Sequence, residues 1–121
     1  INEIMAVVNC KVKFIRPHYK NLEDWCEDYN NVYIGRAGVV FIDKVRFPKK
    51  QSNFCNKFKI GKDGTREEVI EKYRNYIVKR LENEPELKQE LKKMKGKNLG
   101  CWCHPEPCHG DVLMELINNI N

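Results

Sequence analysis

The sequence predicts one small α/β domain, a two-layer or three-layer sandwich with a mainly parallel sheet and flanking helices. Two observations carry this prediction. Short apolar segments rich in β-branched residues are interleaved along the chain with amphipathic segments of helical period. No repeat, linker or low-complexity segment divides the 121 residues. A chain of this length can bury a core of its own, so residues 1–121 are expected to form a single domain.

The first third of the chain is predicted to alternate between strands and a short helix. A first strand is expected over residues 5–15, because Cys10, Val12 and Phe14 alternate with lysines before Arg16-Pro17 ends the run. A helix is expected over residues 21–29, capped by Asn21. Its inner face would carry the apolar and aromatic side chains of Leu22, Trp25, Cys26 and Tyr29.

The middle of the chain is predicted to contain two further strands. Residues 32–36 resemble a strand that ends in a glycine loop. Residues 39–47 resemble another strand or a hairpin arm, with a bend expected at Asp43-Lys44. A polar loop and a short stretch of alternating apolar and basic residues follow.

The second half of the chain is predicted to hold three helices and one strand. Thr65 and Glu68 form a capping-box pattern, which indicates the start of a helix that runs to about Glu82. A second helix carries Leu87, Leu91 and Met94 on one face, and Gly96 closes it. A strand over residues 97–103 and a final amphipathic helix complete the predicted fold.

The charge of the chain is mildly basic, with 22 Lys and Arg against 17 Asp and Glu and a net charge of +5. This bias is typical of a solvated surface and is too small to indicate nucleic-acid binding by itself. Seven of the basic residues lie between Lys44 and Lys62, which we call the basic middle segment. If the protein contacts nucleic acid, this segment is the best candidate for the contact.

Cysteine content and hydropathy indicate the cellular setting. No apolar run approaches the roughly 18 residues that span a bilayer, and no secretory leader is visible. No membrane association is therefore expected, and the expected location is the cytoplasm, or the host cytosol for a viral protein. The six cysteines are accordingly expected to be reduced thiols that act as ligands, nucleophiles or core residues.

Residues 100–111, Gly-Cys-Trp-Cys-His-Pro-Glu-Pro-Cys-His-Gly-Asp, hold the densest set of chemically active side chains. A strand that breaks at prolines and leads into a helix is where α/β proteins place their sites. One interpretation is a ligand pocket in which the helix N-terminus holds a phosphate or carboxylate. Cys108 would then be a low-pKa thiol, and His109 or Asp111 would handle protons, so these three residues are the catalytic candidates.

Two other interpretations of this motif remain open. Thiolates and imidazole suit zinc, which would be held by Cys101, Cys103, Cys108 and His109. The spacing C-x-C-x4-C-H differs from the usual zinc knuckles, and an iron–sulfur cluster fits it still less well. Alternatively, the cysteines are small core residues and the prolines only shape a turn.

The motif also carries a resemblance to a known family. Together with Tyr33-Ile34-Gly35-Arg36 and the Asn56 region, it resembles the domain-of-unknown-function family numbered 4326, found in phages, large DNA viruses and microbes. The chain departs from the family pattern at Cys55 and Lys57, where glycine and proline are usual, and residues 37–53 resemble an insertion. The family brings no established activity, so the resemblance bears on fold and site location.

From the motif and the resemblance together, we expect a site at the carboxyl ends of adjacent strands. Its predicted ligand-binding residues are Gly35, Arg36, Asn56, Cys101, Cys103, Cys108, His109 and Gly110. The leading functional hypothesis is a pocket for a small anionic, nucleotide-like ligand, with Arg36 paired to phosphate. The alternatives are a zinc-stabilised, non-catalytic module that binds nucleic acid or protein, and a thiol enzyme that uses Cys108. Whether the protein is an enzyme stays open.

Overall fold

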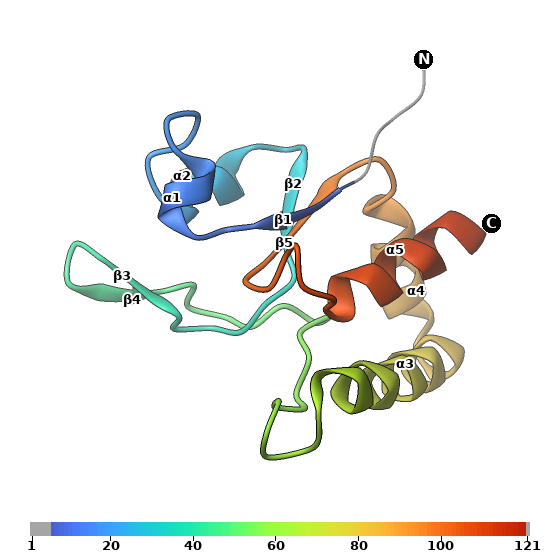
Figure 1. The fold of residues 1–121 in the computed structure, drawn as a ribbon. Helices are drawn as coiled ribbons and strands as arrows, with labels where there is room; N and C mark the ends of the chain where they lie inside the picture. The colour runs from blue at the N-terminus through green and yellow to red at the C-terminus, as the bar shows by residue number, and fades with distance from the viewer. Residues whose placement is uncertain (1–5, 121) are drawn as a thin grey trace.

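The computed structural model describes residues 6–120 and shows a three-layer α/β sandwich (Figure 1). Its sheet contains three short parallel strands in the order β1-β5-β2. The strands are β1 (Val7–Asn9), β2 (Asn31–Tyr33) and β5 (Asn98–Cys101). The predicted α/β class and the mainly parallel sheet are confirmed.

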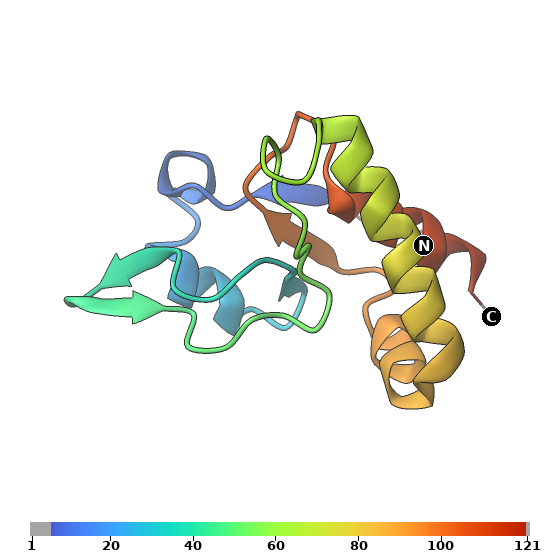
Figure 2. The same cartoon turned by 90° about the horizontal axis from the view of Figure 1, so that it is seen from below.

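The helices cover both faces of this sheet. Two short helices lie on one face, α1 (Val12–Ile15) and α2 (Leu22–Glu27). Three longer helices lie on the other, α3 (Arg66–Asn83), α4 (Pro85–Lys93) and α5 (His109–Asn119). Figure 2 shows the two groups of helices separated by the strands.

Two apolar clusters hold the layers together. The main core lies between the sheet and helices α3, α4 and α5, and its centre includes Tyr73, Ile77 and Leu99. The minor core lies under α1 and α2 and is built on Leu22 and Trp25. Fourteen buried residues form the main core and four form the minor core, so most of the apolar burial lies on the side of the longer helices.

The central strand β5 contributes to both cores, as its alternation predicts. Leu99 and Cys101 belong to the main core, whereas Trp102 packs against the minor core. Gly100, between Leu99 and Cys101, faces the minor core and lies so close to Trp25 and Cys10 that a Cβ atom would overlap both side chains. A glycine is therefore required for the minor core to approach the sheet.

The first strand is much shorter than the sequence predicts. Only Val7–Asn9 are extended, residue 5 lies outside the described residues, and α1 occupies the second half of the predicted strand. Asn9 causes the change of direction, because its Oδ1 accepts from the Lys11 amide at 3.0 Å and its Nδ2 donates to the His104 carbonyl at 2.8 Å. The apparent alternation of residues 10–15 therefore belongs to a turn and a helix.

The predicted helix starts are confirmed. Asn21 caps α2 by accepting from the Asp24 amide at 2.9 Å. Thr65 and Glu68 form both hydrogen bonds of a capping box at the start of α3. The predicted inner face of α2 is wrong at Tyr29, which lies beyond the end of the helix and is 81% exposed.

The segment between β2 and α3 contains an antiparallel hairpin, β3 (Val40–Ile42) and β4 (Val45–Phe47). Asp43 and Lys44 have positive φ values of 51° and 67° and form its tight turn, at the predicted bend. The hairpin extends away from the sheet (Figure 1), and within residues 6–120 its two strands pair with each other and not with the sheet. This hairpin lies within residues 37–53; whether the segment is an insertion relative to the family stays a prediction.

None of the helices within residues 6–120 combines the length and apolar character needed to cross a bilayer. All six cysteines are free thiols.

Candidate functional site

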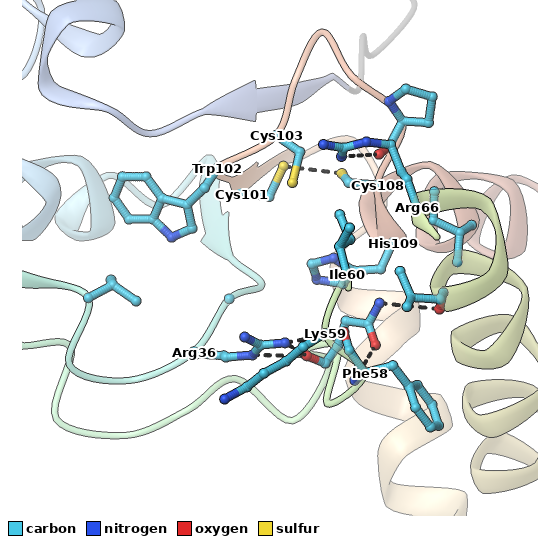
Figure 3. A pocket seen from close by; sticks show the side chains of 16 residues that line it. Arg36, Phe58, Lys59, Ile60, Arg66, Cys101, Trp102, Cys103, Cys108 and His109 are labelled. Carbon is cyan, nitrogen blue, oxygen red and sulfur yellow. Dashed lines mark hydrogen bonds between the residues drawn. The ribbon is translucent and has the colours of Figure 1, made fainter. Parts of the chain in front are cut away.

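A cavity of about 380 Å³ opens at the carboxyl ends of β2 and β5, between the first turns of α3 and α5 (Figure 3). The structure brings nearly all of the predicted ligand-binding residues to its wall. Those that line it are Gly35, Arg36, Asn56, Cys101, Cys103, Cys108 and His109. The exception is Gly110, which packs tightly against the side chains of Ile34 and Val7.

The charge of the cavity wall is positive. Its cationic side chains are those of Arg36, Lys59 and Arg66, and neither Asp nor Glu is among the described residues that line it. The N-termini of α3 and α5 add the positive ends of two helix dipoles. The wall therefore favours an anion.

Sequence reasoning missed Lys59 and Arg66 as parts of this wall. Arg66 is the first residue of α3, and its Nη1 donates to the Pro107 carbonyl at 2.9 Å, which ties the start of α3 to the loop before α5. The capping box located the helix start but contained no signal for its neighbour in space. Lys59 lies in a loop whose course depends on contacts with residues distant in sequence.

Arg36 is held by main-chain carbonyls. Its Nε and Nη2 donate to the Asn56 carbonyl at 3.0 and 2.7 Å, and Nη2 also donates to the Phe58 carbonyl at 3.3 Å. Only Nη1 has no partner among residues 6–120. The expected bidentate pairing with phosphate would therefore require Arg36 to release the loop it holds, so its more direct role is to shape the wall.

Gly35 is required by the side chain of Tyr33. A Cβ atom at position 35 would overlap the Tyr33 ring. The Tyr33 hydroxyl donates to the Arg36 carbonyl at 2.8 Å and accepts from the Trp102 Nε1 at 2.9 Å. These bonds fix the turn after β2 against the end of β5.

His109 is buried and held in one orientation. Its Nε2 donates to the Ile34 carbonyl at 2.7 Å, and its ring meets the Tyr73 ring edge-on with centroids 5.0 Å apart. Burial, with a smaller contribution from Arg36, lowers the pKa of His109, so the ring is neutral at pH 7. In that tautomer Nδ1 carries the lone pair, and it has no partner among residues 6–120.

Asp111 is occupied as a helix cap. Its Oδ2 accepts from the Cys108 amide at 3.0 Å, while the Gly110 amide donates to Cys108 Sγ at 3.3 Å, which completes a capping box at the start of α5. The Asp111 side chain is exposed and does not line the cavity. Its predicted part in proton transfer is not tested by this arrangement.

Three cysteines meet at one wall of the cavity. Cys101 Sγ and Cys108 Sγ are 3.2 Å apart, and Cys103 lies beside them. The single proton of the Cys108 thiol is shared with Cys101 and Cys103, which lowers the pKa of both neighbours and raises the pKa of Cys108. The predicted low pKa of Cys108 is therefore wrong: Cys108 is the proton donor of the group, and the thiolate character lies on its neighbours.

The donors do not fit the zinc interpretation. Among residues 6–120 no three His, Cys, Asp or Glu side chains are placed to hold one metal ion. Two thiolates on a tetrahedral zinc ion would be about 3.8 Å apart, whereas Cys101 and Cys108 are 3.2 Å apart.

The basic middle segment is divided between two places in the structure. Lys44 and Arg46 lie on the hairpin, and Lys59 lies at the cavity. Lys57 is directed toward the Tyr76 ring, with Nζ 4.4 Å from the ring centroid. Contact between this segment and nucleic acid stays a prediction.

Fold and cavity together define the class: a small three-layer α/β protein with a cationic cavity at the carboxyl edge of its parallel sheet. The chain belongs to the family described as domain of unknown function DUF4326, whose model matches residues 18–119. The resemblance inferred from the Cys-rich motif is thus confirmed.

Its relatives include two uncharacterised viral proteins. It is 37% identical over 62 residues to "Uncharacterized 12.4 kDa protein in nrdA-td intergenic region" of Enterobacteria phage T4. The aligned region covers 50% of this chain and 57% of the phage protein. It is 33% identical over 98 residues to "Uncharacterized protein R718" of Acanthamoeba polyphaga mimivirus. The aligned region covers 74% of this chain and 68% of the mimivirus protein. The chain thus spans little more than half the length of the phage relative. No solved structure matches the chain.

Proposed function

We propose that the protein binds a small anionic, nucleotide-like ligand in the cavity at the start of α3 and α5. The observation that carries the proposal is the composition of the wall, which combines three cationic side chains and two helix N-termini with no described carboxylate. A cavity of about 380 Å³ falls within the range for small-molecule sites.

Arg66 and Lys59 are the side chains we assign to the anionic group of the ligand. Arg66 uses Nη1 for the Pro107 carbonyl and also interacts with the Cys103 sulfur; we assign its remaining N–H groups to charge-assisted hydrogen bonds with the ligand. The amides of Cys108 and Gly110 are already bonded within the cap of α5. The field of that helix, rather than these two amides, would therefore attract the anion.

The remainder of the wall suits a planar ring. Trp102, Phe58 and Ile60 supply apolar and aromatic surface. The lone pair of His109 Nδ1 would accept from an N–H or O–H group of the ligand, such as an exocyclic amine or a ribose hydroxyl. An anion joined to a ring that carries such donors is the chemistry of a nucleotide.

Isothermal titration calorimetry with a panel of nucleoside mono-, di- and triphosphates at fixed ionic strength tests this proposal. Arg66→Gln should weaken binding about tenfold or more, because it removes a charge-assisted bond worth roughly 1.5–3 kcal/mol. Arg16→Gln is the matched control: Arg16 is exposed, lies away from the cavity and also donates to a main-chain carbonyl, that of Lys20 at 3.0 Å. It should leave binding unchanged.

Two outcomes would contradict the proposal. One is the absence of heat from every nucleotide at millimolar concentration. The other is equal weakening by Arg66→Gln and Arg16→Gln, which would indicate non-specific attraction to a basic protein. Arg36→Gln is unsuitable as the main test, since it would release the Asn56 and Phe58 carbonyls and alter the wall itself.

A further inference from the structure

The thiol group at the cavity wall has an arrangement that ligand binding does not require. Of the six free cysteines, Cys101 from the end of β5, Cys108 from the cap of α5 and Cys103 from the loop between them lie together. All three line the cavity. Three thiols, from β5, the following loop and the cap of α5, are therefore reached through the same cavity.

The geometry of the group favours formation of a disulfide. Cys101 Sγ and Cys108 Sγ are 3.2 Å apart, only about 1.2 Å more than the length of an S–S bond. Cys101 and Cys108 are 2% and 4% exposed, whereas Cys103 is half-buried. An oxidant that enters through the cavity therefore meets Cys103 more readily than the pair behind it.

The surroundings of Cys103 stabilise a thiolate. The Cys108 thiol donates to it, and the Arg66 guanidinium and Lys11 ammonium add positive charge; together they lower its pKa. A thiolate is the form of cysteine that reacts with electrophiles. Cys26 is a contrasting half-buried cysteine, because burial raises its pKa to about 11.

We infer that Cys101, Cys103 and Cys108 form a redox-active centre. A hydroperoxide oxidises Cys103, and thiol–disulfide exchange within the group then produces a Cys101–Cys108 disulfide. The substrate class is a small hydroperoxide, represented by hydrogen peroxide. The inference is independent of the proposed nucleotide binding, because it uses the protein without any ligand.

The reaction balances in three steps. The Cys103 thiolate attacks one peroxide oxygen, the O–O bond breaks, and the departing hydroxide takes a proton to become water, which leaves a sulfenic acid. Cys108 gives up its proton and attacks Cys103 Sγ, which forms a disulfide and expels a second water. Cys101 then attacks Cys108 Sγ and releases Cys103 as a thiolate. Two thiols lose two electrons and two protons, and one peroxide becomes two waters.

Mass spectrometry of the intact, folded protein after treatment with dilute hydrogen peroxide tests the inference. One disulfide should form and should be reversed by dithiothreitol. Chymotryptic cleavage after Trp102 separates Cys101 from the peptide that carries Cys108, so the two peptides should be recovered joined. Cys103→Ser should still form this link, but about tenfold more slowly or worse, because it lacks the accessible thiolate.

A second variant separates the steps. In the double variant Cys101→Ser/Cys108→Ser the sulfenic acid on Cys103 should persist and be trapped by dimedone, since neither neighbouring thiol is left to form a disulfide with it. Serine is also a good helix cap, so α5 should keep its start. Cys26→Ser is the matched control and should form the disulfide at the wild-type rate.

Three results would overturn the inference: a disulfide rate that Cys103→Ser leaves unchanged, oxidation of Cys26 as fast as that of Cys103, or accumulation of sulfinic acid on Cys103 without any link between Cys101 and Cys108. Circular dichroism of each variant before oxidation establishes that it is folded. Nucleotide titration of the reduced wild-type protein is a separate measurement, so the failure of one proposal does not affect the other.

Discussion

Among single residues, His109 gives the clearest dependence of stability on pH. Its pKa is lowered in the folded protein by burial, whereas the unfolded chain binds a proton near pH 6.5. As the pH falls below that value, the unfolded state gains a proton that the folded state does not take up. Stability is therefore complete above about pH 6.5 and is lost as the pH falls toward the folded pKa.

We predict that His109→Gln removes most of this dependence between pH 7 and pH 5, although Gln lowers stability overall by leaving a cavity beside Tyr73. Urea denaturation at several pH values measures the slope. His104→Gln, at an exposed histidine, should keep the wild-type slope. A slope unchanged by His109→Gln would show that other groups carry the pH dependence.

The residues of the site illustrate which chemistry can be predicted from sequence. The types and spacing of Cys101, Cys103, Cys108 and His109 identified the chemically active segment, and the structure places all four at one cavity. The order of the thiol pKa values could not be predicted, because it depends on which sulfur donates within the group and on the charge of Arg66.

At the scale of elements, strand β5 depends on a residue with no side chain. A Cβ atom at Gly100 would overlap Trp25 and the Cys10 sulfur, both of which are fixed within the minor core. We predict that Gly100→Ala lowers the free energy of unfolding by about 1–3 kcal/mol, the usual cost of overpacking. Denaturant unfolding followed by tryptophan fluorescence measures the change.

Gly110→Ala provides the comparison. Its Cβ atom would lie 3.1 Å from Ile34 Cδ1 and Val7 Cγ1, which are the ends of side chains and can shift. It should cost less than Gly100→Ala. The reverse order would mean that the first turn of α5 tolerates less displacement than the minor core does.

Element boundaries were predictable where the signal is local. The capping residues Asn21 and Thr65 mark helix starts through hydrogen bonds to amides three residues away. The first strand was mispredicted because its end is set by the bond from Asn9 to the His104 carbonyl, a contact across 95 residues. The alternation of apolar and basic residues over 10–15 is local and gives no information about that distant contact.

At the scale of the molecule, the hairpin β3–β4 lies outside the layers. Phe41 and Val45 are 65% and 56% exposed, whereas Val40 and Phe47 pack against the minor core. We predict that replacing residues 41–46 with Asn-Gly changes the free energy of unfolding by less than about 1 kcal/mol, because few buried contacts are lost. Phe47→Ala, at the packed end, should cost more. Denaturant titration of both variants measures these changes. A large decrease in the free energy of unfolding on replacing residues 41–46 would show that the hairpin unfolds together with the rest of the fold.

The fold class was predictable because the interleaving of apolar and amphipathic segments constrains the layers. The sequence pattern placed Asn56 near Arg36, but the way the loop is held and the place of Lys59 were not predictable, because Arg36 bonds to the main-chain carbonyls of Asn56 and Phe58. Every residue has a main-chain carbonyl, so the sequence does not indicate which carbonyls will accept a hydrogen bond from an arginine.

The order of the strands in the sheet has a consequence for synthesis. β5 lies between β1 and β2, and each of these pairs with β5 alone. No bond of this sheet can form until residues 98–101 have been made, so β1 and β2 keep open edges while more than 60 further residues are synthesised. We expect a nascent chain stalled before residue 98 to be bound by chaperones and cut readily by proteases, and to become resistant once β5 has emerged.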